Sequence, residues 1–427
     1  MIDQIEIQPT SVPIRGTIRP PGSKSITNRA LICAALARGR STLTGALDSE
    51  DTRVLIDSLL RLGISVEASS DRSELDIAGC GGAIPSRQAE LYIANSGTSV
   101  RFLTAMLAVG NGIYRLDGTA RMRERPIQDL LDALTQLQVQ AVSEPGTGCP
   151  PVVLHAAGLR GGNVEVRGDV SSQFLSGLLL AAPYAQQPMT IRVKGNLVST
   201  PYIHTTLSVM QAFGLRVEAD DLRQFVVPNE GYQGTDYEIE PDASAASYFF
   251  AAAAITGGQI TVEGLSSNSL QGDIRFCDSL QQMGCQVEYM SNKTKVTGPA
   301  TLRGIEINMN EISDTVQTLA AVALFAEGPT IIRDVAHIRH KETDRIGNLA
   351  IELRKLGAEV EDFSDGLKIT PSKLHGATLL TYDDHRMAMS LALAGLRLPG
   401  VVITNPKCTE KTYPGFFADL ESVIGDR

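Results

Sequence analysis

Lysine and arginine side chains gather beside short polar turns in this chain of 427 residues. The most distinctive turn is Asn95-Ser96-Gly97-Thr98, which Arg101 follows. The cations near this turn and its counterparts are Lys24, Arg29, Arg101, Arg121, Arg123, Arg125, Lys341, Arg345, Arg386 and Lys411. The formal net charge of the chain is nevertheless −10. An acidic protein that concentrates cations at a few turns is predicted to bind small anions there.

Acidic side chains accompany these cations in the C-terminal part of the chain. Asp314 opens an apolar segment, and Lys341, Glu342 and Arg345 follow on the next loop. Lys341 and Arg345 are four residues apart, which would place them on one face of a helix. A functional cluster and a surface ion pair both fit that spacing, so the residues alone leave the two interpretations open.

The segment Pro21-Gly22-Ser23-Lys24-Ser25 invites comparison with a nucleotide-binding loop. Such a loop requires glycine directly before the lysine, and Ser23 stands there instead. Two interpretations remain: a lysine and a helix start that face an anion, or a Pro-Gly turn with a solvated lysine. His337 and His340 lack the further ligand that a metal site requires, so no metal is predicted.

The polar turns recur with a regular period, which predicts an internal repeat. They lie at Lys24, Ser96, Ser171, Asp242, Asp314 and Asp384, with separations of 72, 75, 71, 72 and 70 residues. An apolar, Ala- and Leu-rich segment follows each turn and predicts a buried helix. These helices are expected over Arg29–Leu36, Arg101–Ala108, Phe174–Ala182, Ser244–Ile255, Thr315–Phe325 and Met387–Leu396. Their expected N-caps are Ser25, Ser96, Ser172, Asp242, Asp314 and Asp384.

A second marker supports the same period. An amphipathic helix ends at Leu62-Gly63, Phe213-Gly214, Met283-Gly284 and Leu356-Gly357, and at Leu137-Gln138 without glycine; a strand follows each time. Glycine at such a position predicts a left-handed helix stop. Each repeat is therefore interpreted as strand, buried helix, strand, amphipathic helix, strand and strand.

Six repeats divide most naturally into two domains of three. Domain I is predicted to comprise residues 1–20 and 241–427, and domain II residues 21–240. The sixth repeat ends one strand early, and the alternating pattern around Ile5 and Ile7 predicts that the N-terminus supplies it. Two crossing segments, near 19–22 and 238–242, would form a hinge, so we expect an active-site cleft that opens and closes.

Composition narrows the class of protein. Hydrophobic residues make up 43% of the chain, enough for full cores. The six cysteines show no paired spacing, and no apolar run approaches the roughly 20 residues of a membrane helix, so a cytoplasmic protein without a membrane partner is expected. The negative charge and the absence of tryptophan argue against nucleic acid as a partner.

Several segments together resemble the EPSP synthase family, the 3-phosphoshikimate 1-carboxyvinyltransferases of aromatic amino-acid biosynthesis. The signature segments are Pro21–Ser25 with Asn28-Arg29, and Asn95–Thr98 with Arg101. The resemblance continues in order through Arg123–Pro126, Ser171–Phe174, Ser199–Tyr202, Asp242–Ser244, Lys341–Arg345, Asp384–Ala388 and Lys407–Thr409. It runs the length of the chain.

The resemblance implies a two-lobed, inside-out α/β barrel of six βαβαββ repeats, with buried helices whose N-termini point toward the cleft. It implies a monomer without a cofactor that moves the enolpyruvyl group of phosphoenolpyruvate to the 5-hydroxyl of shikimate 3-phosphate. It also implies that the herbicide glyphosate occupies the phosphoenolpyruvate site. Both substrates are phosphorylated carboxylates, which agrees with the anion-binding turns.

Roles for individual residues follow from the same resemblance. Asp314 is the expected base, Glu342 the expected acid, and Lys24 assists proton transfer. The expected phosphoenolpyruvate ligands are Lys24, Asn95, Gly97, Arg125, Gln173, Arg345, Arg386 and Lys411. The expected shikimate 3-phosphate ligands are Lys24, Ser25, Arg29, Ser171, Ser172, Gln173, Ser199, Tyr202, Asp314, His337 and Lys341, with His385 also in the cleft. His337 stands where many relatives have asparagine.

Three other functions fit parts of the same pattern. A UDP-N-acetylglucosamine enolpyruvyl transferase is disfavoured because no cysteine lies between Asp117 and Pro126, where that family usually has a reactive one. A noncatalytic, anion-binding repeat protein would explain the period without Asp314 or Glu342. An RNA-end processing enzyme of related repeat structure conflicts with the net charge of −10.

Overall fold

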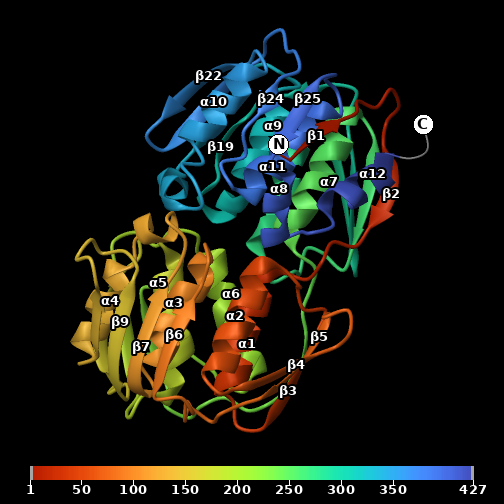
Figure 1. Cartoon of the computed structure of the whole chain (residues 1–427). Helices are drawn as coiled ribbons and strands as arrows, with labels where there is room; N and C mark the ends of the chain where they lie inside the picture. The colour runs from red at the N-terminus through yellow and green to blue at the C-terminus, as the bar shows by residue number, and fades with distance from the viewer. Residues whose placement is uncertain (1–2, 425–427) are drawn as a thin grey trace. The chain divides into compact units, whose positions relative to one another are not determined.

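The computed structural model describes residues 3–424 (Figure 1). The chain divides into two compact units. The N-terminal unit is Gly22–Ile239, and the C-terminal unit is Met1–Pro21 together with Glu240–Arg427. The fold is the expected α/β fold of six βαβαββ repeats, three in each unit.

Three four-stranded sheets form the N-terminal unit, one for each repeat. The strands of the first sheet lie in the order β14 (Asp236–Glu238), β3 (Arg40–Thr44), β5 (Glu74–Ala78) and β4 (Ser65–Ala68). Those of the second lie in the order β6 (Gln88–Tyr92), β7 (Asn111–Asp117), β9 (Val152–Ala157) and β8 (Gln140–Ser143). Those of the third lie in the order β10 (Gly162–Arg167), β11 (Met189–Lys194), β13 (Gln224–Val227) and β12 (Glu218–Asp220). In each sheet the first pair is parallel and the other pairs are antiparallel.

The C-terminal unit repeats this arrangement with an incomplete last sheet. The strands of its first sheet lie in the order β16 (Gln286–Met290), β17 (Lys293–Thr297), β15 (Gln259–Glu263) and β2 (Arg15–Ile18). Those of the second lie in the order β19 (Glu306–Asn308), β21 (Thr330–Arg333), β23 (Gly366–Thr370) and β22 (Glu359–Phe363). The last sheet has three strands, in the order β1 (Gln4–Ile7), β25 (Val401–Thr404) and β24 (Thr378–Leu379). A short pair, β18 (Leu302–Arg303) with β20 (Ala326–Glu327), is separate.

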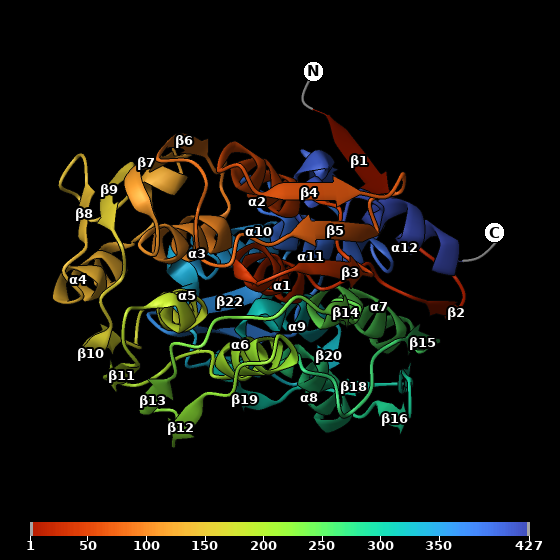
Figure 2. The same ribbon diagram turned by 90° about the horizontal axis from the view of Figure 1, so that it is seen from below.

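Three central helices pack against one another inside each unit, with the sheets around them (Figures 1 and 2). They are α1 (Lys24–Leu36), α3 (Gly97–Leu107) and α5 (Ser172–Ala181) in the N-terminal unit, and α7 (Ala243–Thr256), α9 (Val316–Ala323) and α11 (His385–Gly395) in the C-terminal unit. The helices between the later strands are α2 (Glu50–Arg61), α4 (Gln128–Gln136), α6 (Pro201–Ala212), α8 (Phe276–Gln282), α10 (Gly347–Lys355) and α12 (Phe416–Ile424). Every residue of α7 from Ala243 to Ile255 is buried, as its alanine-rich sequence predicts.

In each unit, one strand of the first sheet comes from the chain segment that leads into the other unit. β2 precedes α1 in the chain but pairs in parallel with β15 of the C-terminal unit. β14 precedes α7 but pairs in parallel with β3 of the N-terminal unit. At the other end, β1 pairs antiparallel with β25, with Ile5 opposite Ile403. These exchanges complete the first sheet of each unit and the last sheet of the chain.

The helix starts confirm half of the expected N-caps. Side chains of Ser96, Asp242 and Asp384 accept backbone amides of α3, α7 and α11. The expected caps Ser25 and Ser172 are wrong, because Ser23 and Ser171 cap α1 and α5 instead. Asp314 is also not a cap: it lies inside the 3-10 segment η4 (Asn310–Thr315), which Ile312 kinks with φ −124° and ψ 36°.

The stops of the amphipathic helices have the expected left-handed backbone. Gly63 after α2 has φ +82°, and Gly284 after α8 has φ +107°. Gln138 after α4 takes the same conformation at φ +61° without glycine. A side chain there is strained, since an L residue carries its Cβ against the backbone in that region.

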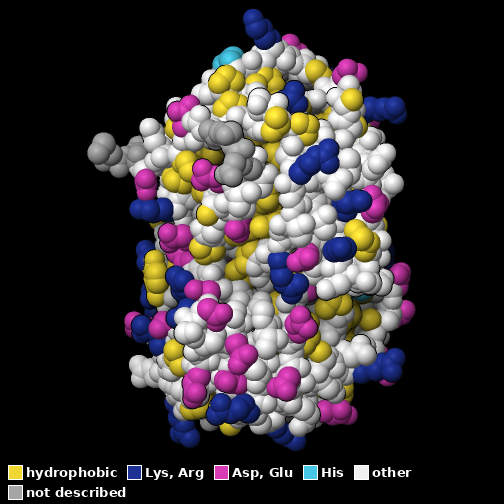
Figure 3. All heavy atoms as spheres, turned by 90° about the vertical axis from the view of Figure 1, so that its right-hand side faces the viewer, with side chains coloured by type: hydrophobic (Ala, Val, Ile, Leu, Met, Phe, Trp, Pro, Cys, Tyr) yellow, Lys and Arg dark blue, Asp and Glu magenta, His cyan; other side chains and the backbone are white. Residues whose placement is uncertain are grey.

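The surface mixes charges of both signs. Figure 3 shows lysine, arginine, aspartate and glutamate side chains interspersed over one face of the molecule, with groups of hydrophobic side chains among them. Within residues 3–424, no helix is both long and apolar enough to cross a membrane.

Candidate active site

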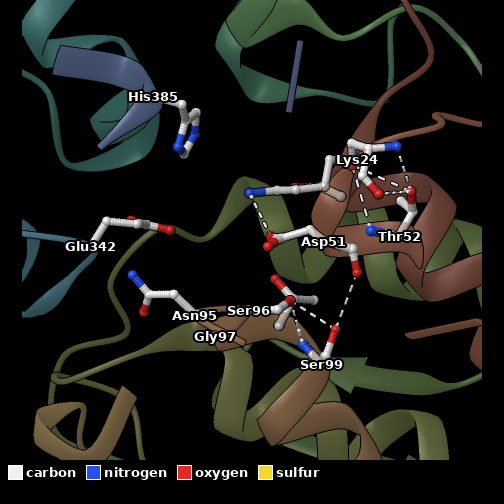
Figure 4. A network of polar contacts seen from close by, with 12 residues as sticks. Lys24, Asp51, Thr52, Asn95, Ser96, Gly97, Ser99, Glu342 and His385 are labelled. Atoms are coloured by element: carbon white, nitrogen blue, oxygen red, sulfur yellow. Dashed lines mark hydrogen bonds and ion pairs between the residues drawn. The ribbon is translucent and has the colours of Figure 1, made fainter. Parts of the chain in front are cut away.

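Two neighbouring repeats of the N-terminal unit meet through Asp51 (Figure 4). Ser96 caps α3, its hydroxyl lies 2.7 Å from that of Ser99, and the Ser99 hydroxyl reaches the carbonyl of Asp51. The Asp51 carboxylate lies 3.6 Å from Nζ of Lys24, at the start of α1. The two helix starts are therefore tied together. Asp51 carried no signal in the sequence, because it looks like an ordinary acidic residue in the first turn of an amphipathic helix.

Arg125 lies against the turn that begins α3. Its Nη1 donates to the carbonyl of Asn95 at 2.8 Å and to Oδ1 of Asn95 at 3.2 Å, and the residue is 4% exposed. A Cβ on Gly97 would stand 2.7 Å from Cζ of Arg125 and 2.9 Å from Nη1 of Arg101. Glycine at this position is required for a guanidinium to approach the helix start so closely. Backbone amides and a guanidinium are both groups that bind anions.

Gln173 joins the starts of α3 and α5. Its Oε1 accepts from Nη1 of Arg101 at 2.7 Å, and its Nε2 donates to the hydroxyl of Thr98 at 3.5 Å. Ser171 accepts the backbone N–H of Gln173, and Ser172 opens the helix behind it. The structure thus places Gln173 next to the turn at Gly97.

Arg29 is buried at 2% exposure and braces α1 against α6. It donates to the hydroxyl of Thr206 at 2.8 Å, to the carbonyl of Ser25 at 2.8 Å and to the carbonyl of Tyr202 at 3.2 Å. Its guanidinium carbon lies 5.2 Å from the centre of the Phe102 ring. Burial lowers the pKa of Arg29 to about 10, which still leaves it charged at neutral pH. Arg29 therefore holds Ser25 and Tyr202 in place, and Ser199 lies in the loop before α6.

The C-terminal unit surrounds Asp314 with cations. Nζ of Lys341 lies 2.6 Å and Nη1 of Arg345 3.3 Å from its Oδ1, while Nη2 of Arg386 lies 2.8 Å from its Oδ2. Lys341 and Arg345 do not share a helix face, because the chain forms no helix between η5 (Ala336–His340) and α10. Arg345 is only 1% exposed, so the interpretation as a surface ion pair is wrong. The two cations converge on one carboxylate from a loop.

Arg345 also holds two further carboxylates. It donates to both oxygens of Asp384, at 2.7 and 3.1 Å, and lies 2.7 Å from Oε2 of Glu342. Burial works against its charge, but Asp384 and Glu342 outweigh it and raise the pKa of Arg345. His385 is fully buried, with Nδ1 3.7 Å from Oδ1 of Asp384. Glu342 thus lies within the same buried network as Asp314.

His337 and Lys341 lie in an environment that disfavours charge. Burial, and then the positive charge of Lys341, lower the pKa of His337 to about 3, so its imidazole is neutral at physiological pH. Burial also lowers the pKa of Lys341, although Asp314 opposes this.

Lys411 lies in η6 (Pro406–Lys411) and is 4% exposed. In the described part of the chain, no three His, Cys, Asp or Glu side chains are placed to hold a metal ion.

Fold and geometry define an α/β protein of six repeats whose units each bring buried cations to the starts of central helices. Its sequence matches the profile of one family, EPSP synthase (3-phosphoshikimate 1-carboxyvinyltransferase), over residues 9–420. The chain belongs to this family.

Individual relatives agree with the family match. The chain is 47% identical over 425 residues to 3-phosphoshikimate 1-carboxyvinyltransferase of Trichormus variabilis, covering 99% of this chain and 100% of the relative. It is 46% identical over 440 residues to the chloroplastic enzyme of Arabidopsis thaliana, covering 98% and 84%. The structure of EPSP synthase from Acinetobacter baumannii superposes with a TM-score of 0.83 at 27% identity, covering 98% of both chains.

Proposed function

We propose that this enzyme transfers the enolpyruvyl group of phosphoenolpyruvate to the 5-hydroxyl of shikimate 3-phosphate and releases phosphate. The observation that carries the proposal is the buried network around Arg345, in which two carboxylates, Asp314 and Glu342, stand among cations. Such a network offers an acid and a base beside charges that bind phosphate and carboxylate groups.

The reaction requires three proton movements. Asp314 takes the proton of the 5-hydroxyl as that oxygen bonds to the central carbon of phosphoenolpyruvate, and Glu342 gives a proton to the methylene carbon. Loss of phosphate then requires a proton to leave the resulting methyl group. Lys24 assists these transfers and binds phosphoenolpyruvate. Each transfer is worth roughly 100- to 10,000-fold in rate when the acid or base is well placed.

The remaining groups bind and orient the two substrates. Phosphoenolpyruvate is assigned to Lys24, Asn95, Gly97, Arg125, Gln173, Arg345, Arg386 and Lys411. Shikimate 3-phosphate is assigned to Lys24, Ser25, Arg29, Ser171, Ser172, Gln173, Ser199, Tyr202, Asp314, His337 and Lys341, with His385 nearby. Support comes from the hydrogen bonds that group Gln173, Arg101 and Thr98 in one unit, and Asp314, Lys341 and Arg386 in the other.

Both units contribute to this list, so we propose that the substrates bind in a cleft between them. The segments that link the units, near 19–22 and 238–242, then act as the hinge. We further propose that the enzyme works as a monomer in the cytoplasm, without a cofactor and without a nucleic acid or membrane partner.

One assay tests the substrate assignment. Phosphate release is measured with phosphoenolpyruvate and either shikimate 3-phosphate or UDP-N-acetylglucosamine. Release only with shikimate 3-phosphate is expected. Release with the nucleotide sugar alone would overturn the assignment, and release with neither would favour a noncatalytic anion-binding protein.

A matched pair of variants tests the proposed base. Asp314→Asn is expected to stay folded and to bind both substrates while losing about 100- to 10,000-fold in kcat. Asp242→Asn is the control, because Asp242 accepts an amide of its own helix and asparagine caps equally well. Equal losses in the two variants would show that neither aspartate acts as a base.

A further inference from the structure

The surroundings of Asp314 create a difficulty for a base. Three cations, Lys341, Arg345 and Arg386, lie within 3.3 Å of its oxygens. Nearby positive charges stabilise a carboxylate in its ionised form and so weaken its affinity for a proton. A carboxylate that must accept a proton from a hydroxyl needs a neighbour that strengthens its affinity for a proton. A negative charge close to Asp314 would supply it.

Asp273 provides such a charge from the neighbouring repeat. It lies in the 3-10 segment η3 (Gly272–Arg275), is 4% exposed, and accepts a hydrogen bond from the hydroxyl of Ser244 in the first turn of α7. η3 packs against η4, the segment that carries Asp314. An ion pair of 2.6 Å between Arg275 and Glu311 ties the two segments together at the surface. Asp273 and Asp314 therefore lie on segments that pack against each other.

The charges facing Asp273 come from every element around it. Asp314 from η4 and Asp242 at the start of α7 are negative, while Arg386 from α11 is positive. Arg275 on its own segment is engaged by Glu311 of η4, and Asp278 on α8 accepts from the hydroxyl of Tyr289. Burial, followed by the charge of Asp314, raises the pKa of Asp273 to about 6. The two carboxylates thus repel each other when both are ionised, and the repulsion acts equally on Asp314.

We propose that Asp273 is a positioning residue for the reaction: its carboxylate, held by Ser244 beside η4, offsets the three cations around Asp314 and keeps Asp314 basic enough to take the proton of the substrate hydroxyl. The proposal rests on the proposed role of Asp314 as the base. Asp273 itself touches neither the substrates nor the reacting atoms in this account.

The same arrangement makes Asp273 unfavourable for folding. Its pKa in the folded protein lies above the usual value for an aspartate, so the folded state prefers the protonated form. Its contribution to stability is therefore complete below about pH 4 and is lost as the pH rises through about 6. Replacing the carboxylate with a neutral amide should stabilise the protein at pH 8 and have little effect at pH 4.

The pH dependence of kcat/KM tests the proposal. In Asp273→Asn, Asp314 loses a repelling neighbour only above about pH 6, where Asp273 is ionised in the native protein. The part of the acidic limb near pH 6 should therefore disappear: kcat/KM should match the native protein at pH 5 and be about threefold lower at pH 8. Asp278→Asn, a few residues along the chain in α8, is the control and should leave the limb in place. The ionisations of the substrates are the same in all variants. An Asp273→Asn variant whose kcat/KM keeps the native ratio between pH 8 and pH 5 would overturn the proposal.

Two further measurements distinguish a variant that does not fold from a wrong proposal about Asp273 or Asp314. Thermal unfolding at pH 8 and pH 4 shows whether Asp273→Asn is folded, with a higher Tm expected at pH 8 only. If that variant does not fold, Ser244→Ala removes a hydrogen bond that stabilises the ionised form of Asp273, so the part of the limb near pH 6 should move to higher pH. No shift would again overturn the proposal. Full turnover in Asp314→Asn would instead remove the base on which the proposal rests.

Discussion

Individual side chains in this enzyme take their properties from neighbours far away in the sequence. Gly97 is an example, because the absence of a side chain there lets Arg125 and Arg101 lie against the start of α3. Neighbours also set the charge of His337, which burial and Lys341 keep neutral. A residue's type was visible in the sequence, but these contacts were not. Each of the two leads to a test.

Gly97→Ala should weaken phosphoenolpyruvate binding. The new methyl group meets the guanidinium of Arg125, which must move, and losing one charge-assisted hydrogen bond costs about 1.5 to 3 kcal/mol. We expect the KM for phosphoenolpyruvate to rise by about tenfold or more, with a much smaller change for shikimate 3-phosphate. Gly415→Ala is the control, since a Cβ there would meet only Asp419 at 3.7 Å.

Inhibition by glyphosate sharpens the same test. The family resemblance implies that glyphosate uses the phosphoenolpyruvate site, and it is the longer molecule. A difference of about 2 to 3 kcal/mol in the two penalties would shift the ratio of their affinities by roughly 30- to 150-fold. Equal losses for inhibitor and substrate would mean that Gly97 does not line the site.

His337→Asn should make the protein less sensitive to acid. The pKa of His337 is about 3 in the folded state and about 6.5 when exposed, so the unfolded chain binds the extra proton first as the pH falls. The stability linked to this group is complete above about pH 6.5 and is lost between there and about pH 3. Tm measured from pH 7.5 to 4.5 should therefore fall less steeply in the variant. Parallel curves would contradict the burial of a neutral imidazole.

At the scale of elements, the repeat period predicted the positions of helices and strands better than the local motifs did. Apolar segments at a regular spacing predicted the central helices, and glycine predicted where amphipathic helices stop. The N-cap residues were harder to predict from the sequence, because Ser23-Lys24-Ser25 and Ser171-Ser172 each contain two nearby hydroxyls. Only the backbone geometry determines which of the two caps the helix. The kink at Ile312 left no mark in the composition.

The site itself could be predicted only in part, for a physical reason. Its chemistry comes from residues such as Asp314 and Lys341 in the fifth repeat and Arg386 in the sixth, which meet through tertiary packing. Their types and turn positions could be found along the chain. Asp51, which pairs with Lys24, could not be found in this way, because an acidic residue in the first turn of a helix is common.

The cap of α7 gives a prediction at this scale. The side chain of Asp242 accepts the backbone amide of Ala245 at 2.9 Å. Asp242→Ala should cost about 1 kcal/mol of stability, whereas Asp242→Asn should cost little, because asparagine is an equally good cap. Thermal unfolding is expected to show a Tm lower by about 2 to 4 °C for the alanine variant alone. Equal loss in both variants would indicate that the charge, rather than the cap, matters at this position.

The exchange of strands sets the organisation of the whole molecule. β2 belongs to the C-terminal unit although α1 follows it, and β14 belongs to the N-terminal unit although α7 follows it. The chain therefore passes between the units twice, at points where each sheet receives its parallel edge strand. As a result the N-terminal unit is one continuous segment, and the C-terminal unit is built from two.

A fragment comprising residues 22–239 should fold by itself, because it contains every strand of its three sheets, including β14. A shorter fragment, 22–234, lacks β14 and the buried Ile239, and so exposes the edge of β3. We expect the longer fragment to unfold cooperatively in urea, the shorter one to unfold at a lower urea concentration, and neither to release phosphate, because both lack Asp314 and Glu342. Far-UV circular dichroism against urea is the measurement, with the full chain as reference. Equal midpoints for the two fragments would show that the strand supplied from the second crossing adds nothing to the first sheet. An unfolded 22–239 fragment would show that the N-terminal unit depends on the rest of the chain for its stability.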